Sequence, residues 1–174
     1  MTTTGKLKAT YTLQQDWLKA FYKLQELSDS LEVGDPFNYN RAREIHTAFL
    51  IGLEVSSTLA GADAYDANGE AELKSTTGKL KATYNGISVL PSWEEQEEYL
   101  TNEKIGKYYN HYITRYEGSN LVECWKMKGE YVLMLLLPKL KKQYHSSKSR
   151  KDPRLSTSLG AVEIRTYGEL IDTK

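Results

Sequence analysis

The stretch Asp63-Ala64-Tyr65-Asp66-Ala67-Asn68-Gly69-Glu70-Ala71-Glu72-Leu73-Lys74 carries the strongest structural signal in this chain. An Asn-Gly pair between two short strand-like segments predicts a β-hairpin with a two-residue turn. With Asn68 and Gly69 as the turn, the predicted cross-strand pairs are Ala67 with Glu70, Tyr65 with Glu72, and Asp63 with Lys74.

This hairpin predicts a cluster of charged groups. Successive side chains of a strand point to opposite faces. Asp63, Glu72 and Lys74 are therefore expected on one face of a sheet. The other face then holds Asp66, Ala71 and Leu73.

Two carboxylates and a lysine on a rigid sheet are what Mg²⁺-dependent phosphodiester cleavage needs. Mg²⁺ takes oxygen ligands and keeps several waters, so Asp63, Glu72 and the Leu73 carbonyl are the candidate ligands, completed by the scissile phosphate. Lys74 is expected either to orient and deprotonate the water or to stabilise charge on the phosphate, and the neighbouring carboxylates favour the second role. The alternative is a solvated hairpin whose Asp63–Lys74 ion pair contributes well under about 1 kcal/mol.

Length and composition indicate one globular domain over residues 1–174. The chain is 40% hydrophobic and 26% charged, and it contains no apolar run of membrane-spanning length. The first residues lack the apolar core of a signal peptide. Cys124 is the only cysteine, which excludes an internal disulfide and a cysteine zinc site, and we expect it in the core. These features favour a cytoplasmic protein.

Charge is unevenly distributed along the chain. The net charge is zero, which disfavours an indiscriminate nucleic-acid binder, but residues 139–154 hold seven Lys or Arg against one acid. This segment is either a phosphate-contacting stripe or a solvated helix end and loop. In addition, residues 3–11 and 76–84 are the same nonamer, TTGKLKATY. Only the second copy adjoins the hairpin, so Lys79 and Lys81 are candidate phosphate contacts.

Periodicity predicts an α/β (α+β) protein with a mixed central sheet flanked by helices. We expect helices at 13–33, 40–53, 92–110 and 131–144, with Ser92 and Glu95 forming a capping box at the third. Strands are expected at 111–116, 120–127 and 161–167, and a basic loop at 145–158. The three histidines show no metal-ligand spacing, and His111 is expected at a strand edge.

Over about residues 45–170 the chain resembles small type II restriction endonucleases of the PD-(D/E)xK superfamily. Apart from the hairpin, the resemblance includes Ile51-Gly52-Leu53 upstream, and Tyr116-Glu117-Gly118 and Asp152-Pro153-Arg154 downstream. It implies a restriction-endonuclease-like fold, with Asp63 and Glu72 as metal ligands and Lys74 as the catalytic lysine. The chain departs from the pattern at Ala62, where proline is usual, at Ala60, where a further acid is found, and in a hairpin that is one residue shorter.

The resemblance also implies which residues read DNA. Lys151, Asp152 and Arg154 match a loop that enters the major groove, where arginine suits a bidentate contact to guanine. Tyr84 and Asn85 lie in the segment where the family carries base-reading histidines, which are absent here. We therefore expect another recognition sequence, a short GC-rich palindrome.

Such enzymes act as homodimers, because each subunit cuts one strand of a two-fold symmetric site. The helix within residues 1–35 is the expected dimer surface, unless it packs on its own domain. A DNA methyltransferase acting on the same site is the expected companion. Two other functions stay open: a junction resolvase or repair nuclease on the same fold, and a DNA-binding module without catalysis.

Overall fold

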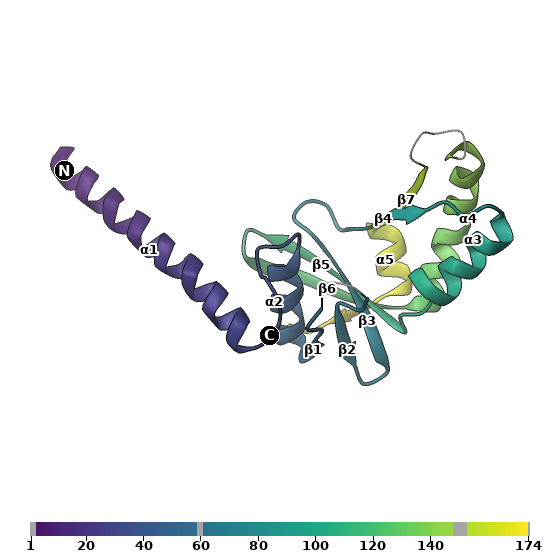
Figure 1. Cartoon of the computed structure of the whole chain (residues 1–174), viewed down its shortest axis with the longest axis horizontal. Coiled ribbons are helices and arrows are strands. Elements are labelled where there is room, and N and C mark those ends of the chain that lie inside the picture. Colours follow the sequence, from purple (N-terminus) through teal and green to yellow (C-terminus); the bar gives the residue numbers. More distant parts are fainter. Residues whose placement is uncertain (1–2, 59–60, 148–152, 174) are drawn as a thin grey trace.

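The strand that carries Glu72 and Lys74 lies inside a six-stranded mixed sheet (Figure 1). The computed structural model describes residues 3–58, 61–147 and 153–173. Its helices are α1 (Thr3–Ser30), α2 (Arg41–Ile51), α3 (Trp93–Tyr99), α4 (Gly129–Ser147) and α5 (Ala161–Tyr167), with a π-helical turn, η1 (Leu100–Lys104). Its strands are β1 (Glu54–Val55), β2 (Ala64–Asp66), β3 (Gly69–Thr76), β4 (Lys81–Ser88), β5 (Asn110–Glu117), β6 (Asn120–Lys128), β7 (Arg154–Gly160) and β8 (Glu169–Ile171).

The main sheet has the order β1-β2-β3-β5-β6-β8. Only β3 and β5 run parallel, and the other neighbours are antiparallel. Strands β4 and β7 form a separate two-stranded antiparallel ribbon. The expected mixed α+β class is thus confirmed.

Each face of the main sheet covers its own apolar core. Along β5, Tyr112 joins a small cluster beneath α2, whereas its neighbour Ile113 joins the larger cluster, which also contains residues of α3, α4, α5 and the β4–β7 ribbon. Figure 1 shows α2 on one side of the sheet and α3 to α5 on the other. Cys124 is buried in the smaller cluster, as expected.

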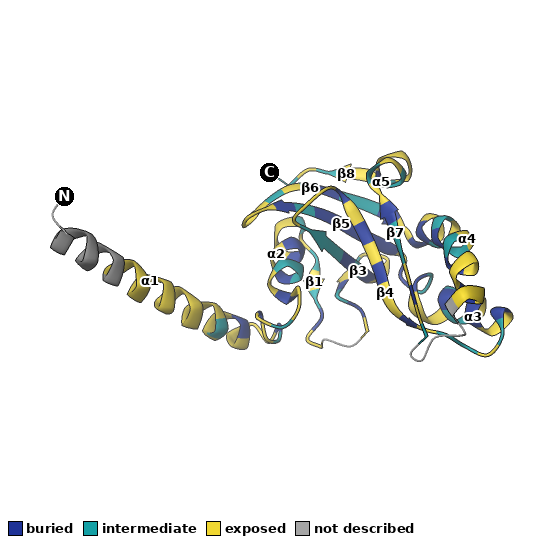
Figure 2. Ribbon diagram, turned by 90° about the horizontal axis from the view of Figure 1, so that it is seen from above, coloured by how far each residue is buried: buried dark blue, intermediate teal, exposed yellow. Residues whose placement is uncertain are grey.

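Helix α1 extends away from the rest of the molecule (Figures 1 and 2). The helix expected at 13–33 is confirmed in type and begins earlier. Most of its described side chains are exposed, with Leu13 at 70% and Trp17 at 64%. The alternative that this helix packs along its own domain is therefore wrong for most of its described length. No helix in the described ranges, α1 included, combines the length and apolar character of a membrane span.

The hairpin forms in a different register from the predicted one. Ala67 and Asn68 form the turn, and the pairs are Asp66 with Gly69, Tyr65 with Glu70, and Ala64 with Ala71. The Asp66 carboxylate explains the difference, because it accepts the backbone N–H of Asn68 at 2.7 Å and the side chains of Asn110 and Tyr112. These contacts hold Asp66 at the end of the strand, before the turn.

The C-terminal prediction is wrong in two places. Residues 154–158, expected to be part of the basic loop, belong to β7, in which Leu155 and Leu159 are buried against the larger core. Residues 161–167, expected as strand, form α5, because the Glu163 carboxylate caps the N–H of Gly160 at 2.9 Å and also binds Lys139.

The third helix is shorter than expected. The capping box of Ser92 and Glu95 is confirmed. After α3, however, the chain continues through η1 and turns into β5 at Asn110. The strands expected at 111–116 and 120–127 and the helix expected at 131–144 are confirmed with slightly longer bounds.

Candidate active site

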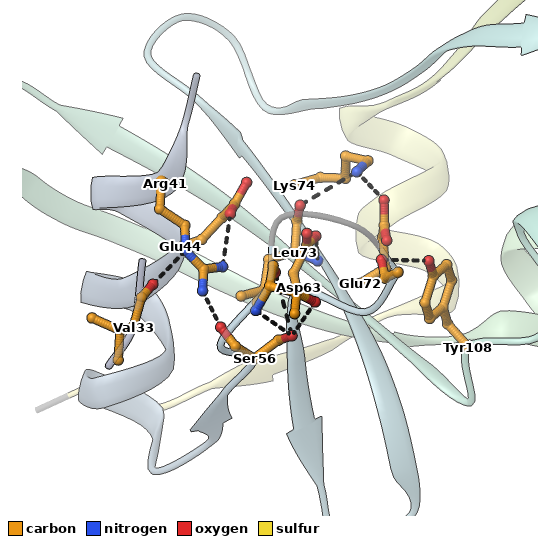
Figure 3. Close-up of polar contacts among 11 residues, drawn as sticks. Val33, Arg41, Glu44, Ser56, Asp63, Glu72, Leu73, Lys74 and Tyr108 are labelled. Atoms are coloured by element: carbon orange, nitrogen blue, oxygen red, sulfur yellow. Dashed lines mark hydrogen bonds and ion pairs between the residues drawn. The ribbon is translucent and has the colours of Figure 1, made fainter. Parts of the chain in front are cut away.

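Asp63, Glu72 and Lys74 meet at the hairpin (Figure 3). The Lys74 ammonium forms an ion pair with the Glu72 carboxylate. The backbone N–H of Leu73 donates to Asp63 Oδ2 at 2.8 Å, so Asp63 lies against the segment that joins the other two residues. The structure thus brings together the three residues that the strand pattern places on one face.

The backbone of Asp63 is fixed by two hydrogen bonds, one through its N–H and one through its carbonyl. Its N–H donates to the Ala71 carbonyl of β3 at 3.2 Å, and its carbonyl accepts the N–H of Ser56 at 3.1 Å. Nearby, the Tyr108 hydroxyl donates to the Gly61 carbonyl at 2.9 Å. The carboxylate therefore projects from a segment that is anchored although it precedes β2.

The carboxyl groups of Asp63 and Glu72 lie close enough to change the pKa values at the site. Burial raises the pKa of Asp63 to about 7, and the charge of Glu72 adds to the rise. Burial alone lowers the pKa of Lys74, but the charges of Glu72 and Asp63 outweigh it and leave that pKa raised. The lysine is consequently an ammonium at neutral pH, and the acidic pair favours binding of a cation.

Glu44 is a third acid at the site that the sequence analysis missed. It lies on α2, lines the same cleft as Glu72, and its charge further raises the pKa of Asp63. The buried Arg41 guanidinium contacts Glu44 at 3.4 Å while donating to the carbonyls of Val33 and Ser56 (Figure 3). Nothing in the sequence marks Glu44, because a single acid on an amphipathic helix is ordinary.

A cleft of about 350 Å³ opens in front of Glu72 and Lys74. Its walls come from α2, β3, β4 and η1. The lining residues are Asn40, Glu44, Glu72, Leu73, Lys74, Ser75, Thr76, Lys81, Thr83, Tyr84, Asn85, Ile87, Lys104 and Ile105. Lys104 is a second residue that the sequence analysis missed, since the π-helical turn that presents it has no sequence signature.

The β4–β7 ribbon has an apolar face and a polar face. Ala82, Tyr84 and Ile87 are buried, whereas Lys81, Thr83 and Asn85 of β4 are exposed. Between Tyr84 and Ile87 the pairing with β7 shifts, and Gly86 takes a positive φ of 66°. Such a bulge re-aims neighbouring side chains, and here Asn85 lines the cleft.

The residues predicted to contact DNA differ in whether they line the cleft and in how exposed they are. Lys81 and Asn85 line the cleft, and Lys79 is exposed in the turn before β4 but does not line the cleft. Tyr84 is only 5% exposed and its hydroxyl bonds His111, so the structure leaves little of the Tyr84 side chain for the predicted direct contact with DNA.

The predicted reading loop is described only in part. Arg154 is exposed at the start of β7, with Nη1 at 3.4 Å from both the Gly86 carbonyl and Ser88 Oγ. Lys151 and Asp152 lie outside the described residues.

His111 lies behind the charged cluster, contrary to the expected strand edge. It is fully buried on the central strand β5 and pairs in register with Glu72 of β3. Burial lowers the pKa of His111 to about 3, so the imidazole is neutral. Its two ring nitrogens contact the Tyr84 hydroxyl at 3.0 Å and the Ile105 carbonyl at 3.1 Å.

The donor set fits a hard divalent cation that shares its coordination with a substrate. Within the described residues, no three His, Cys, Asp or Glu side chains form a complete metal site. Asp63 and Glu72 nevertheless provide two carboxylates beside the Leu73 backbone, and Mg²⁺ is commonly bound by one or two carboxylates plus phosphate oxygens and water. Neither a protein-family model nor a curated protein sequence matches this chain.

Proposed function

We propose that this protein is a Mg²⁺-dependent type II restriction endonuclease that hydrolyses both strands of duplex DNA at a short palindromic GC-rich site. The observation that carries the proposal is the meeting of Asp63 with Glu72 and Lys74, which line a polar cleft. We also propose that the chain has a restriction-endonuclease-like fold. The mixed sheet, in which β3 and β5 run parallel, supports this proposal.

Asp63, Glu72 and the Leu73 carbonyl would hold the metal. A bound Mg²⁺ would polarise the scissile phosphate and acidify a water. Burial and the charge of Glu72 raise the pKa of Asp63, and this supports the assignment, because a bound cation would favour the charged form of the Asp63 carboxylate.

Lys74 acts on the phosphate as a cation in this proposal. Its ammonium lies on the cleft wall, and its raised pKa favours the charged form over a general base. A fixed positive group stabilises the negative charge that grows on the phosphate oxygens during hydrolysis. Lys81 and Lys104 line the same cleft and are suited to hold the flanking phosphates.

The β4–β7 ribbon is the proposed reading element. A two-stranded ribbon fits the major groove, and this one presents Lys81, Thr83, Asn85 and Arg154 on exposed positions. The described residues of one chain form one such site, so we propose a homodimer for cutting both strands, with the apolar face of α1 as the contact. A companion methyltransferase for the same site and a cytoplasmic setting belong to the same proposal.

The test is incubation of supercoiled plasmid with MgCl₂ and the full chain, followed by mapping of the fragment ends. We expect discrete fragments that share an end sequence. Glu72→Gln should slow cleavage by about 100-fold or more while DNA binding in EDTA persists. Glu70→Gln is the matched control, because Glu70 lies on the same strand two residues away and instead pairs with Lys107 at 3.1 Å.

Other outcomes would redirect the proposal. Cleavage of branched DNA without sequence preference would indicate a structure-specific nuclease. DNA binding without any Mg²⁺-dependent cleavage would indicate a binding module. Equal cleavage by Glu72→Gln and the unsubstituted protein would remove Glu72 from the metal site.

A further inference from the structure

The Lys74 ammonium lies against a tyrosine that belongs to the other sheet. Lys74 is on β3 of the main sheet, and Tyr84 is on β4 of the two-stranded ribbon. Lys74 Nζ lies 5.7 Å from the centre of the Tyr84 ring. At this distance the negative face of an aromatic ring attracts a cation. The long lysine side chain, flexible in isolation, is therefore bounded by Glu72 on one side and by the Tyr84 ring on another.

The Tyr84 ring is itself fixed by a buried chain of hydrogen bonds. Its hydroxyl lies 3.0 Å from His111 Nδ1, and His111 Nε2 lies 3.1 Å from the Ile105 carbonyl. A carbonyl only accepts, so Nε2 carries the proton and Nδ1 accepts from the tyrosine hydroxyl. The Ile105 carbonyl follows directly after η1, and the Ile105 N–H is bonded to the Leu100 carbonyl at 2.9 Å.

We infer that Tyr84, locked by His111, is a positioning residue that holds the Lys74 ammonium in place for the reaction. The inference rests on the proposed nuclease function for its catalytic part. Tyr84 is flanked along β4 by exposed Thr83 and Asn85, so the element proposed to contact DNA is also the element that holds the catalytic lysine. Binding of DNA to the ribbon and placement of Lys74 are thereby linked through one rigid side chain.

The chain offers a matched control for this arrangement. Tyr116 bonds His46 Nδ1 at 2.9 Å, and their ring centres are 5.7 Å apart and tilted by 56°. The corresponding values for Tyr84 and His111 are 3.0 Å, 5.7 Å and 59°. Arg43 even lies over the Tyr116 ring, at 5.9 Å. The two pairs have the same geometry, but only one of them faces Lys74.

The experiment compares Tyr84→Phe, Tyr84→Leu and Tyr116→Phe, after thermal unfolding has shown that each variant folds. The cleavage readout is the single-turnover rate on supercoiled plasmid with MgCl₂, with DNA affinity measured separately in EDTA. We expect Tyr84→Leu to lower the rate by about 100-fold and Tyr84→Phe by about tenfold, because small displacements of a catalytic group cost rate. DNA affinity in both variants, and every parameter of Tyr116→Phe, should stay within about twofold of the unsubstituted protein.

A second readout does not depend on activity. Because the Lys74 side chain lies against the Tyr84 ring, its Hε protons should show a ring-current shift in the NMR spectrum of the metal-free protein. The shift should disappear in Tyr84→Leu, change in Tyr84→Phe and persist in Tyr116→Phe. This signal reports the position of Lys74 whether or not the protein cuts DNA.

The outcomes separate the inference from the proposed function. If Tyr84→Leu cuts at the normal rate, or loses DNA affinity while its rate at saturation is unchanged, Tyr84 is not a positioning residue. If the unsubstituted protein cuts no DNA, the proposed function fails, and the NMR readout alone decides. An unchanged ring-current shift of Lys74 in Tyr84→Leu then overturns the inference. Loss of that shift supports the conclusion that Tyr84 holds the Lys74 side chain in place.

Discussion

At the scale of single residues, Asp63 and His111 have pKa values displaced in opposite directions. Asp63 has its pKa raised from 3.8 to about 7, chiefly by burial, and His111 has its pKa lowered from 6.5 to about 3 by burial. Both groups are therefore neutral in the folded, metal-free protein at mildly acidic pH. In the unfolded chain both are charged there, one negatively and one positively.

The changes with pH in the stability that the two residues contribute should cancel between about pH 5 and 6.5. Asp63 stabilises the folded state at low pH, and this contribution is lost as pH rises through its folded pKa of about 7. His111 stabilises it above its unfolded pKa, and this contribution is lost as pH falls below 6.5. Each contributes a slope of about 1.4 kcal/mol per pH unit, with opposite sign. Urea unfolding of the metal-free protein should show a nearly flat profile.

Single substitutions should expose each slope. In Asp63→Asn the remaining His111 contribution makes the free energy of unfolding rise with pH by about 1.4 kcal/mol per unit in this window. In His111→Gln the remaining Asp63 contribution makes it fall with pH by a similar amount. Flat profiles for both variants would contradict the burial of these groups in solution.

At the scale of elements, the hairpin shows why the predicted grouping of Asp63, Glu72 and Lys74 on one face survived a wrong register. The predicted pairing joined Tyr65 to Glu72, and the structure joins Tyr65 to Glu70. The shift is two residues, and side chains on a strand repeat with a period of two, so every side chain keeps its face. The geometry of Asp63, Glu72 and Lys74 was thus predictable from alternation alone. The turn was not, because a distant contact from Asp66 to Asn110 and Tyr112 decides it.

The repeated nonamer marks the limit of local prediction. Residues 3–11 lie in helix α1, whereas the identical residues 76–84 form the end of β3, a turn and the first half of β4. In the second copy Leu80, Ala82 and Tyr84 are buried in the larger core. Strand formation there depends on partners from distant segments such as β7, which no local window contains. The same reason applies to β7 and α5, whose types were predicted wrongly.

Arg154 gives a prediction for the β4–β7 ribbon. If the ribbon reads the major groove, Arg154→Ala should reduce discrimination against wrong bases by about 1–3 kcal/mol and broaden the set of sites that are cut. Arg165→Ala is the control, because Arg165 is an exposed arginine of α5 that pairs with Glu123 at 3.3 Å. Sequencing of the cleaved ends from a random DNA pool measures both. An unchanged set of sites would show that Arg154 does not read bases.

At the scale of the whole molecule, the exposed face of α1 stands apart from the cleft. Trp17 stacks on Phe21 with ring centres 5.4 Å apart, and Phe21 stacks on Phe37 at 4.0 Å. Near these stacked rings lies an apolar groove of about 410 Å³, which is lined among others by Leu24, Leu31 and Phe49. Exposed apolar surface of this extent is typical of a protein contact. A second copy of the chain is the partner that the proposed double-strand cleavage requires.

Trp17→Glu tests this assembly. Trp17 is 64% exposed, so a charge there should leave the fold of one chain intact while preventing apolar contact between two. We expect sedimentation to show twice the chain mass for the unsubstituted protein and the single-chain mass for the variant. Gln15→Glu adds the same charge on the opposite side of α1 and should keep the larger mass.

With plasmid and MgCl₂, Trp17→Glu should accumulate nicked circles where the unsubstituted protein yields linear DNA, because separate subunits cut one strand at a time. Linear product without nicked intermediates from a single-chain variant would show that α1 is not the contact on which double-strand cleavage depends.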